Sequence, residues 1–324
     1  MAEKNYADAL LDALRTCMDE DPQFAVMGNE VLGIGPEAPQ FEPFQKEYGD
    51  RIFFPPTSEA GFTALAAGAA MCGRRVFCHL GLASFTYPAF SSIINEIAPA
   101  RLSSGGAVSV PTILHISHGL LHGGGGQHSE SPLSMYWNVP GIEIVVPSGP
   151  REVKGLVRAA YKSDNPTIVI THAFMYGATG EVPDEDYELP FGKAEVKREG
   201  SDVTIVGCSM MVGVAMAAAE QLAGEGIEAE VIDMVSLVPF DKDTVLESVA
   251  KTGRLVVADE GRLRAGVASE VAATVAEEGF GSLKAPIARV ARMDAPVSNA
   301  QSHEGFISPS ADKIVEAAKA AAAA

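Results

Sequence analysis

The hydrophobic pattern in the first half of the chain alternates between two kinds of element. Short apolar runs predict buried strands, at 24–27, 76–80, 111–116, 141–146 and 167–170. Longer stretches with apolar residues at helical spacing, or rich in small residues, predict helices, at 6–18, 61–72, 89–98 and 150–161. Alternation of this kind favours a parallel sheet with helices on both faces.

A polar, proline-rich stretch at 180–193 interrupts this pattern and is the best linker candidate. After it the alternation starts again. Strands are predicted at 202–209, 229–234, 254–260 and 288–290, and helices at 212–223, 241–251, 267–278 and 310–324. The sequence therefore predicts a second, smaller α/β domain.

Composition excludes several function classes. The 324 residues carry 24 Lys and Arg against 42 Asp and Glu, a formal charge of −18, which repels nucleic-acid phosphates and anionic membrane surfaces. Four scattered cysteines form no CxxC pair and suggest a reducing compartment. The N-terminus has no signal or transit pattern, and the apolar stretch 60–73 is too short to span a bilayer. We therefore expect a cytoplasmic protein.

Glu59 stands out in the segment PPTSEAGF (55–62), where a turn leads into a very apolar helix. One interpretation is an acid that interacts with the helix dipole at the first turn. The other is a carboxylate buried in a subunit interface, because Ala64, Gly68 and Cys72 would let another helix approach closely.

A run of four glycines at 123–126 predicts a flexible or tightly bent loop. Four histidines lie in or beside it: His115, His118, His122 and His128. A metal cluster is one hypothesis, although no carboxylate or cysteine stands at ligand spacing. A histidine that moves protons near neutral pH is the other.

Aromatic residues gather at 82–96, where Phe85, Tyr87 and Phe90 precede or begin a helix. Core packing is the default interpretation for such side chains. One of them could instead form a wall for a flat ring.

Several motifs together resemble a known family. They are TSEAGF (57–62), FTYPAFSSIINEIAPARLSSGG (85–106), QHSESP (127–132) and PGIEIVVPSGPREVKGLVRAA (140–160), followed by matching segments in the second half. The chain resembles the beta subunits of pyruvate, branched-chain 2-oxo acid and acetoin dehydrogenases, which depend on thiamine diphosphate. The resemblance covers nearly the whole chain in order.

The resemblance implies a transketolase-like pyrimidine-binding domain at 1–185, a linker at 186–194 and a transketolase C-terminal α/β domain at 195–324. The diphosphate-binding domain would lie on a separate alpha subunit, in a heterotetramer of two alpha and two beta chains. That subunit would supply the magnesium ligands. A lipoyl acyltransferase would be a further partner, next to a small-molecule substrate that the sequence does not identify.

The resemblance also assigns roles. Glu59 matches the catalytic glutamate that hydrogen-bonds the aminopyrimidine of the cofactor, Phe85 the aromatic that packs on the pyrimidine, and His128 the histidine that assists acyl transfer to the lipoyl group. Glu30 would also contact the cofactor. The family commonly has two acids after the glycine at position 28, and here Asn29 and Glu30 stand at these two positions.

Other departures lie near the expected substrate channel. His115 stands where the family often has Arg, and Gly81 and Leu82 replace bulkier or polar residues. The family's monovalent-cation site, with potassium as the candidate ion, would fall between Ala160 and Asn165, where AYKSDNP is an approximate match.

Two rival functions remain open. One is the C-terminal subunit of a split transketolase, which would share both domains and the role of Glu59. The other is a scaffold subunit that has lost catalysis, against which the joint presence of Glu59, Phe85 and His128 argues.

Overall fold

The computed structural model describes residues 1–28 and 38–324. The chain divides into two compact units, and each unit is made of two separate segments of the sequence. The first unit comprises Met1–Gly119 and Met135–Phe191, and the second comprises Leu120–Ser134 and Gly192–Ala324. The segment Leu120–Ser134, here called the His128 segment, therefore packs with the second unit although it interrupts the first in sequence.

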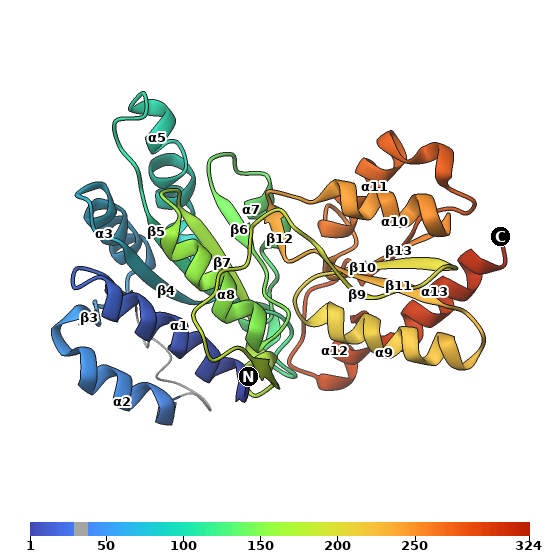
Figure 1. Ribbon diagram of the computed structural model, residues 1–324, viewed down its shortest axis with the longest axis horizontal. Helices are drawn as coiled ribbons and strands as arrows, with labels where there is room; N and C mark the ends of the chain where they lie inside the picture. The colour runs from blue at the N-terminus through green and yellow to red at the C-terminus, as the bar shows by residue number, and fades with distance from the viewer. Residues whose placement is uncertain (29–37) are drawn as a thin grey trace. The chain divides into compact units, whose positions relative to one another are not determined.

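The first unit is built on a parallel sheet with strand order β6-β7-β5-β4-β2-β3 (Figure 1). Its strands are β2 (Ala25–Gly28), β3 (Ile52–Phe53), β4 (Val76–Leu82), β5 (Thr112–His118), β6 (Glu143–Val145) and β7 (Thr167–His172). Every residue of β2, β5 and β7 is buried, as expected for a sheet covered on both faces. A separate antiparallel pair joins β1 (Ala2–Asn5) to β8 (Thr179–Val182).

The helices of the first unit are α1 (Tyr6–Glu20), α2 (Ala38–Tyr48), α3 (Glu59–Met71), α4 (Thr86–Ser91), α5 (Ala100–Ser103) and α8 (Pro150–Lys162). α1 packs along α8, and α3 packs against α4. Local sequence sets their starts: Asn5 accepts a hydrogen bond from the backbone N–H of Asp8, and Pro150 occupies the first turn of α8.

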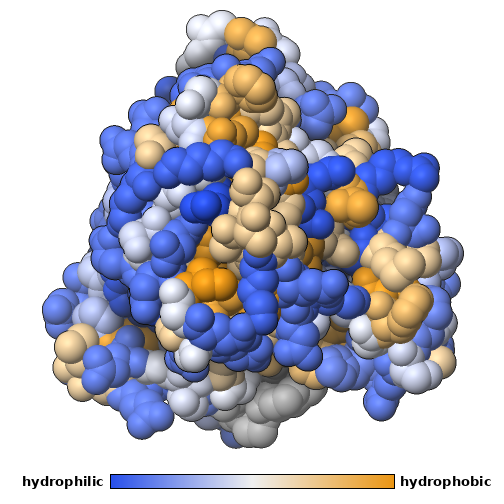
Figure 2. Space-filling view, turned by 90° about the vertical axis from the view of Figure 1, so that its right-hand side faces the viewer, coloured by the Kyte–Doolittle hydropathy of each residue, from blue (hydrophilic) through white to orange (hydrophobic). Residues whose placement is uncertain are grey.

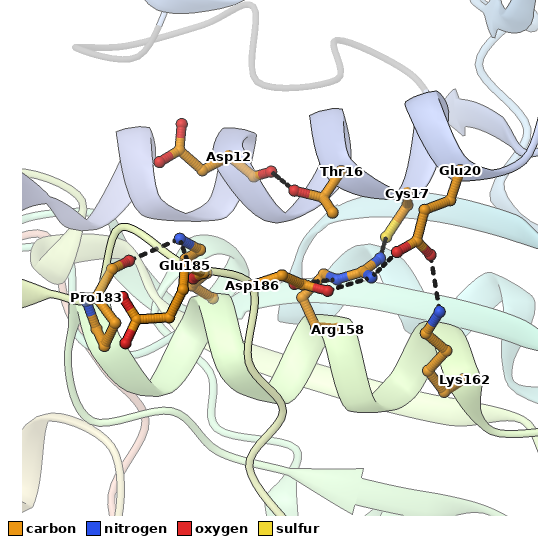
Figure 3. Close-up of polar contacts among 10 residues, drawn as sticks. Asp12, Thr16, Cys17, Glu20, Arg158, Lys162, Pro183, Glu185 and Asp186 are labelled. Atoms are coloured by element: carbon orange, nitrogen blue, oxygen red, sulfur yellow. Dashed lines mark hydrogen bonds and ion pairs between the residues drawn. The ribbon is translucent and has the colours of Figure 1, made fainter.

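A buried arginine joins α1 and α8 (Figure 3). Arg158 is fully buried and donates hydrogen bonds to Glu20 at 2.6 Å and to Asp186 at 2.7 Å. Its guanidinium also donates to Cys17 Sγ at 3.2 Å, and burial raises the pKa of this thiol to about 12. Cys17 therefore stays protonated and serves packing rather than chemistry.

The second unit has a five-stranded sheet of order β14-β13-β10-β11-β9, parallel except for β9. The strands of this sheet are β9 (Glu195–Arg198), β10 (Val203–Gly207), β11 (Ala229–Asp233), β13 (Leu255–Arg262) and β14 (Ala288–Arg292). The short β12 (Ser236–Val238) is not a strand of this sheet. Helices α10 (Lys242–Thr252) and α11 (Val267–Glu278) cover one face, and α9 (Met210–Gly224) and α13 (Ala311–Ala322) cover the other (Figure 1).

The short helices α6 (Gly125–His128) and α12 (Gln301–Ile307) complete the second unit. The residues of α7 (Leu133–Trp137) are divided between the two units, which meet in sequence between Ser134 and Met135. On the face drawn in Figure 2, hydrophobic areas are interspersed with hydrophilic surface. Phe280 and Phe306 are among the exposed apolar side chains of this unit.

The predicted alternation of strands and helices is confirmed in both units. The helix predicted at 89–98 starts earlier, as α4, and continues as a π-helical turn at Ser92–Ile97. The predicted linker 180–193 is not wholly irregular, because β8 takes up its first residues. No helix among residues 1–28 and 38–324 is long and apolar enough to cross a membrane.

Candidate functional site

Two predicted residues follow the carboxyl ends of β4 and β3, the two strands that flank β2 in the sheet of the first unit. Phe85 ends a 3-10 turn at Ala83–Phe85 directly after β4, and Glu59 begins α3 after β3. Glu30, with Asn29, would follow β2 between them but lies outside the described residues. Because parallel strands end at one edge of a sheet, the fold brings Glu59 and Phe85 to the edge where open α/β sheets bind ligands.

Glu59 is half-buried at the first position of α3. The side chain of Ser58, which precedes it, makes no capping hydrogen bond to the helix. An acid at this position interacts favourably with the helix dipole whether or not it has a further role. Both interpretations of Glu59 therefore remain compatible with its place in the fold.

Phe85 is not part of the core, because 37% of the side chain is exposed. Gly81, at φ +76°, lies directly beside the ring: a Cβ at this position would come within 3.1 Å of Phe85 Cδ2. The absence of a side chain at Gly81 therefore leaves room for the present position of the ring. Phe90, by contrast, is half-buried and packs against Tyr136 at 5.7 Å between ring centroids.

The outer face of α3 is exposed and apolar. Leu65 is 56% exposed, and Ala64, Gly68 and Cys72 are exposed on the same helix or at its end. Large apolar side chains in this unit are also open to solvent at Phe53 and Phe54. The outer face of α3 is the surface at which the sequence predicts contact with another chain. Exposed apolar surface of this kind often marks an interface.

The glycine run in the His128 segment has one defined conformation. Gly125 adopts φ +64°, and a Cβ there would lie 2.1 Å from Asn299 Oδ1. A Cβ on Gly124 would lie 2.8 Å from Ser129 Oγ. Glycine is therefore required for close packing as well as for backbone conformation.

Two buried carboxylates of the second unit hold the start of this segment. Glu304 accepts hydrogen bonds from the backbone N–H groups of His122 at 2.7 Å and Gly123 at 2.8 Å. Glu260 accepts one from Leu120 N–H at 2.7 Å. Sequence inspection did not single out either acid, since only the fold brings them to a loop more than a hundred residues earlier.

His128 ends α6 and is exposed, so its imidazole can meet an incoming group. It belongs to the second unit, whereas Glu59 and Phe85 belong to the first. The predicted site residues are therefore carried by two different compact units.

Two of the four histidines are not in the loop. His115 and His118 lie in β5, and His115 is fully buried. His115 Nδ1 lies 2.8 Å from Nδ1 of His79 on β4, so one imidazole donates and the other accepts. Burial lowers the pKa of His79 to about 4 and that of His115 well below its usual value, so both are neutral at pH 7.

The buried pair continues into a hydrogen-bonded chain. His115 Nε2 lies 3.0 Å from Thr171 Oγ1, which lies 3.1 Å from the Tyr176 hydroxyl. Ser117 Oγ is 2.6 Å from the same hydroxyl. Within residues 1–28 and 38–324, no three His, Cys, Asp or Glu side chains are grouped as metal ligands would be.

The segment predicted to bind a monovalent cation is held by arginines. Asn165 Oδ1 accepts a hydrogen bond from Arg101 at 2.9 Å, and the Ser163 carbonyl accepts one from Arg75. Ala160 is buried within α8. A cation here would share these oxygens with guanidinium groups, and potassium binding stays a prediction.

Comparison with known families matches both halves of the chain. Residues 2–177 match the transketolase pyrimidine-binding domain, and residues 192–314 match the transketolase C-terminal domain. A solved structure described as a split-gene transketolase, an inactive beta4 tetramer, superposes with a TM-score of 0.80 at 26% identity, covering 98% of this chain and 97% of the other.

Relatives of similar length are named as beta subunits of an acetoin oxidoreductase or of pyruvate dehydrogenase. The beta subunit of acetoin:2,6-dichlorophenolindophenol oxidoreductase from Cupriavidus necator is 37% identical, covering 96% of this chain and 95% of that protein. The pyruvate dehydrogenase E1 beta subunit of Staphylococcus epidermidis is 36% identical and covers 99% of both chains. The mitochondrial E1 beta-1 subunit of Arabidopsis thaliana is 38% identical, covering 98% of this chain and 89% of that protein. The chain therefore belongs to the transketolase-like family of 2-oxo acid and acetoin dehydrogenase beta subunits.

Proposed function

We propose that this chain is the beta subunit of the first component of a thiamine-diphosphate-dependent 2-oxo acid or acetoin dehydrogenase. The observation that carries the proposal is the placing of Glu59 and the exposed ring of Phe85 at the carboxyl edge of the first unit's sheet. The full-length similarity of 36–38% to dehydrogenase beta subunits supports the same activity.

The residues at this edge fit the pyrimidine end of thiamine diphosphate. A flat ring can pack on the open side chain of Phe85, and the Glu59 carboxyl can share a proton with a ring nitrogen. When bound, the cofactor supplies a nucleophilic carbon and an electron sink. Glu59 would set the protonation of the pyrimidine, and Phe85 would fix its plane. Glu30, which lies outside the described residues, remains a proposed third contact.

The diphosphate end needs magnesium and backbone donors. We propose that an alpha subunit supplies both, in a complex of two alpha and two beta chains. The exposed face of α3, with Leu65 and Gly68, is the surface proposed for contact with another subunit. The substrate would be a small 2-oxo acid or ketone, and the alpha subunit would contribute to its selection.

We further propose that His128 assists acyl transfer to the lipoyl group of an acyltransferase, as a side chain that can give or take a proton. Its exposed place at the end of α6 leaves it open to a long, flexible carrier. The domain limits 1–185, 186–194 and 195–324 and a cytoplasmic location complete the hypothesis.

The deciding experiment is reconstitution with a candidate alpha subunit, to be sought among the neighbouring reading frames. The mixture should bind thiamine diphosphate with magnesium and acylate a lipoyl domain from a 2-oxo acid or acetoin. The beta chain alone should fold but bind the cofactor weakly. Tight, magnesium-dependent binding by the single chain would contradict the divided site.

A split transketolase is the second candidate, favoured by the superposition at a TM-score of 0.80. Ketol transfer between sugar phosphates by the reconstituted complex, without lipoyl acylation, would establish it instead.

A further inference from the structure

The end of the His128 segment is held by two arginines from the second unit's sheet. Arg262 ends β13 and Arg292 ends β14, and the two residues are register partners on these parallel strands. Glu130 pairs with Arg262 through two hydrogen bonds, of 2.8 and 2.9 Å, and lies 3.6 Å from Arg292 Nη2. One carboxylate thus joins two neighbouring cations.

Arg292 also reaches the backbone next to His128. Its Nη1 donates a hydrogen bond of 2.9 Å to the carbonyl oxygen of Ser129. The Ser129 hydroxyl accepts one from Leu121 N–H at 3.1 Å, which ties the two ends of the segment together. Ser129 is fully buried, so the residue that follows His128 is fixed on both its backbone and its side chain.

Stability alone gives little reason for an arginine at this position. Arg292 is only 1% exposed, and its Nε and Nη2 atoms find no hydrogen-bond acceptor among the described residues. Burial is the main cause of a lowered pKa for Arg292; Arg262 lowers it too, and Glu130 raises it. A buried cation with incomplete partners costs stability, and such exceptions tend to occur where function requires them.

We infer that Arg292, at the end of β14, is a positioning residue for His128. It holds the carbonyl oxygen of Ser129, the residue after His128, while Arg262 holds the carboxylate of Glu130. This inference rests on the proposed role of His128 in acyl transfer. The inferred role of Arg292 requires no contact with substrate or cofactor. Its effect is geometric, since a small displacement of a catalytic group can cost a large factor in rate.

The test separates acyl transfer from the earlier chemistry in the reconstituted complex. Lipoyl-domain acylation reports on His128, and reduction of 2,6-dichlorophenolindophenol by the same complex needs no lipoyl group. Arg292→Gln should lower the kcat of acylation about tenfold and leave the dye rate within about twofold of wild type. Arg292→Lys should recover part of the loss.

Arg289→Gln is the matched control, because Arg289 lies on the same strand but is exposed and bonds Leu263 and Ser269 instead. If Arg292→Gln does not fold, Arg262→Gln replaces it, since that side chain is about a third exposed. The same split between the two rates supports the inference, and rates equal to wild type overturn it.

His128→Ala and the double variant His128→Ala/Arg292→Gln complete the experiment. The double variant should acylate no more slowly than His128→Ala alone, because both changes act through one side chain. Additive losses, or equal losses in acylation and dye reduction, overturn the inference. Normal acylation by His128→Ala would overturn the proposed role of His128 as well, whereas a defect in His128→Ala with none in Arg292→Gln would overturn the inference only.

Discussion

The Glu59–Phe85 edge of the first unit and the His128 segment of the second are built in different ways. Glu59 and Phe85 are placed by the turns that directly follow β3 and β4, so neighbours in sequence determine their positions. His128 is placed by Glu304 and Arg292, which lie far along the chain. The first region is therefore positioned by residues nearby in sequence and is partly exposed. The second region is held at both ends by side chains that lie far away in sequence but in the same unit.

This difference predicts where substitutions act. Changes at the first region should alter cofactor chemistry with little effect on the fold. Changes to the anchors of the second should alter structure first and activity through it.

The largest effect is expected for Glu59→Gln. Glutamine keeps the size of the side chain but cannot share a carboxyl proton with the cofactor, so activity should fall by at least about 100-fold while the complex stays assembled. Hydrogen–deuterium exchange at the reactive carbon of bound thiamine diphosphate measures the step directly. Glu96→Gln, which removes an exposed acid from the same unit, is the control. Near-normal exchange in Glu59→Gln would remove Glu59 from the mechanism.

Gly125→Ala tests whether the His128 segment is as tightly packed as its contacts indicate. A methyl group at φ +64°, 2.1 Å from Asn299 Oδ1, should lower the free energy of unfolding by about 1–3 kcal/mol. Chemical denaturation of the chain measures this. Gly126→Ala is the matched control, because the nearest atom to its Cβ would be 3.5 Å away. Equal stability of the two variants would show that the loop can rearrange freely.

The same contrast explains what the sequence could and could not predict. The strands and helices of both cores could be predicted from the spacing of apolar residues. The start of α3 could be predicted from the turn before Glu59, the acid at which the helix begins. β1 and β9 were missed because their residues are half-buried or exposed and carry no clear alternation. The packing of Leu120–Ser134 with the second unit could not be predicted, because it depends on Glu260, Arg262, Arg292 and Glu304.

Phe85→Ala should weaken thiamine diphosphate binding by about 1–2 kcal/mol, close to a tenfold change in Kd, because the exposed ring would be covered by the pyrimidine. Calorimetric titration of the alpha–beta complex measures it. Tyr87→Ala removes a neighbouring exposed ring and should change Kd less. A larger loss from Tyr87→Ala would assign the pyrimidine wall to Tyr87 instead.

The smallest effect is expected for the buried His79–His115 pair, which lies in the core of the first unit. Both imidazoles have lowered pKa values in the folded chain, so below about pH 6.5 the unfolded chain binds more protons than the folded one. The contribution of this pair to the free energy of unfolding should thus be constant above this pH and fall as pH decreases toward about 4. Between pH 6.5 and 5.5 each histidine should contribute about 1 kcal/mol to this loss.

The double variant His79→Gln/His115→Gln should flatten that pH dependence even if it is less stable at pH 7. The pair is hydrogen-bonded through Thr171 to Ser117 and Tyr176, and the histidines are the groups of this network whose lowered pKa values predict the acid response. His128→Gln, which removes an exposed imidazole, is the comparison. Denaturation curves at several pH values give the slope for each protein, and an unchanged slope in the double variant would place the source of acid sensitivity elsewhere in the chain.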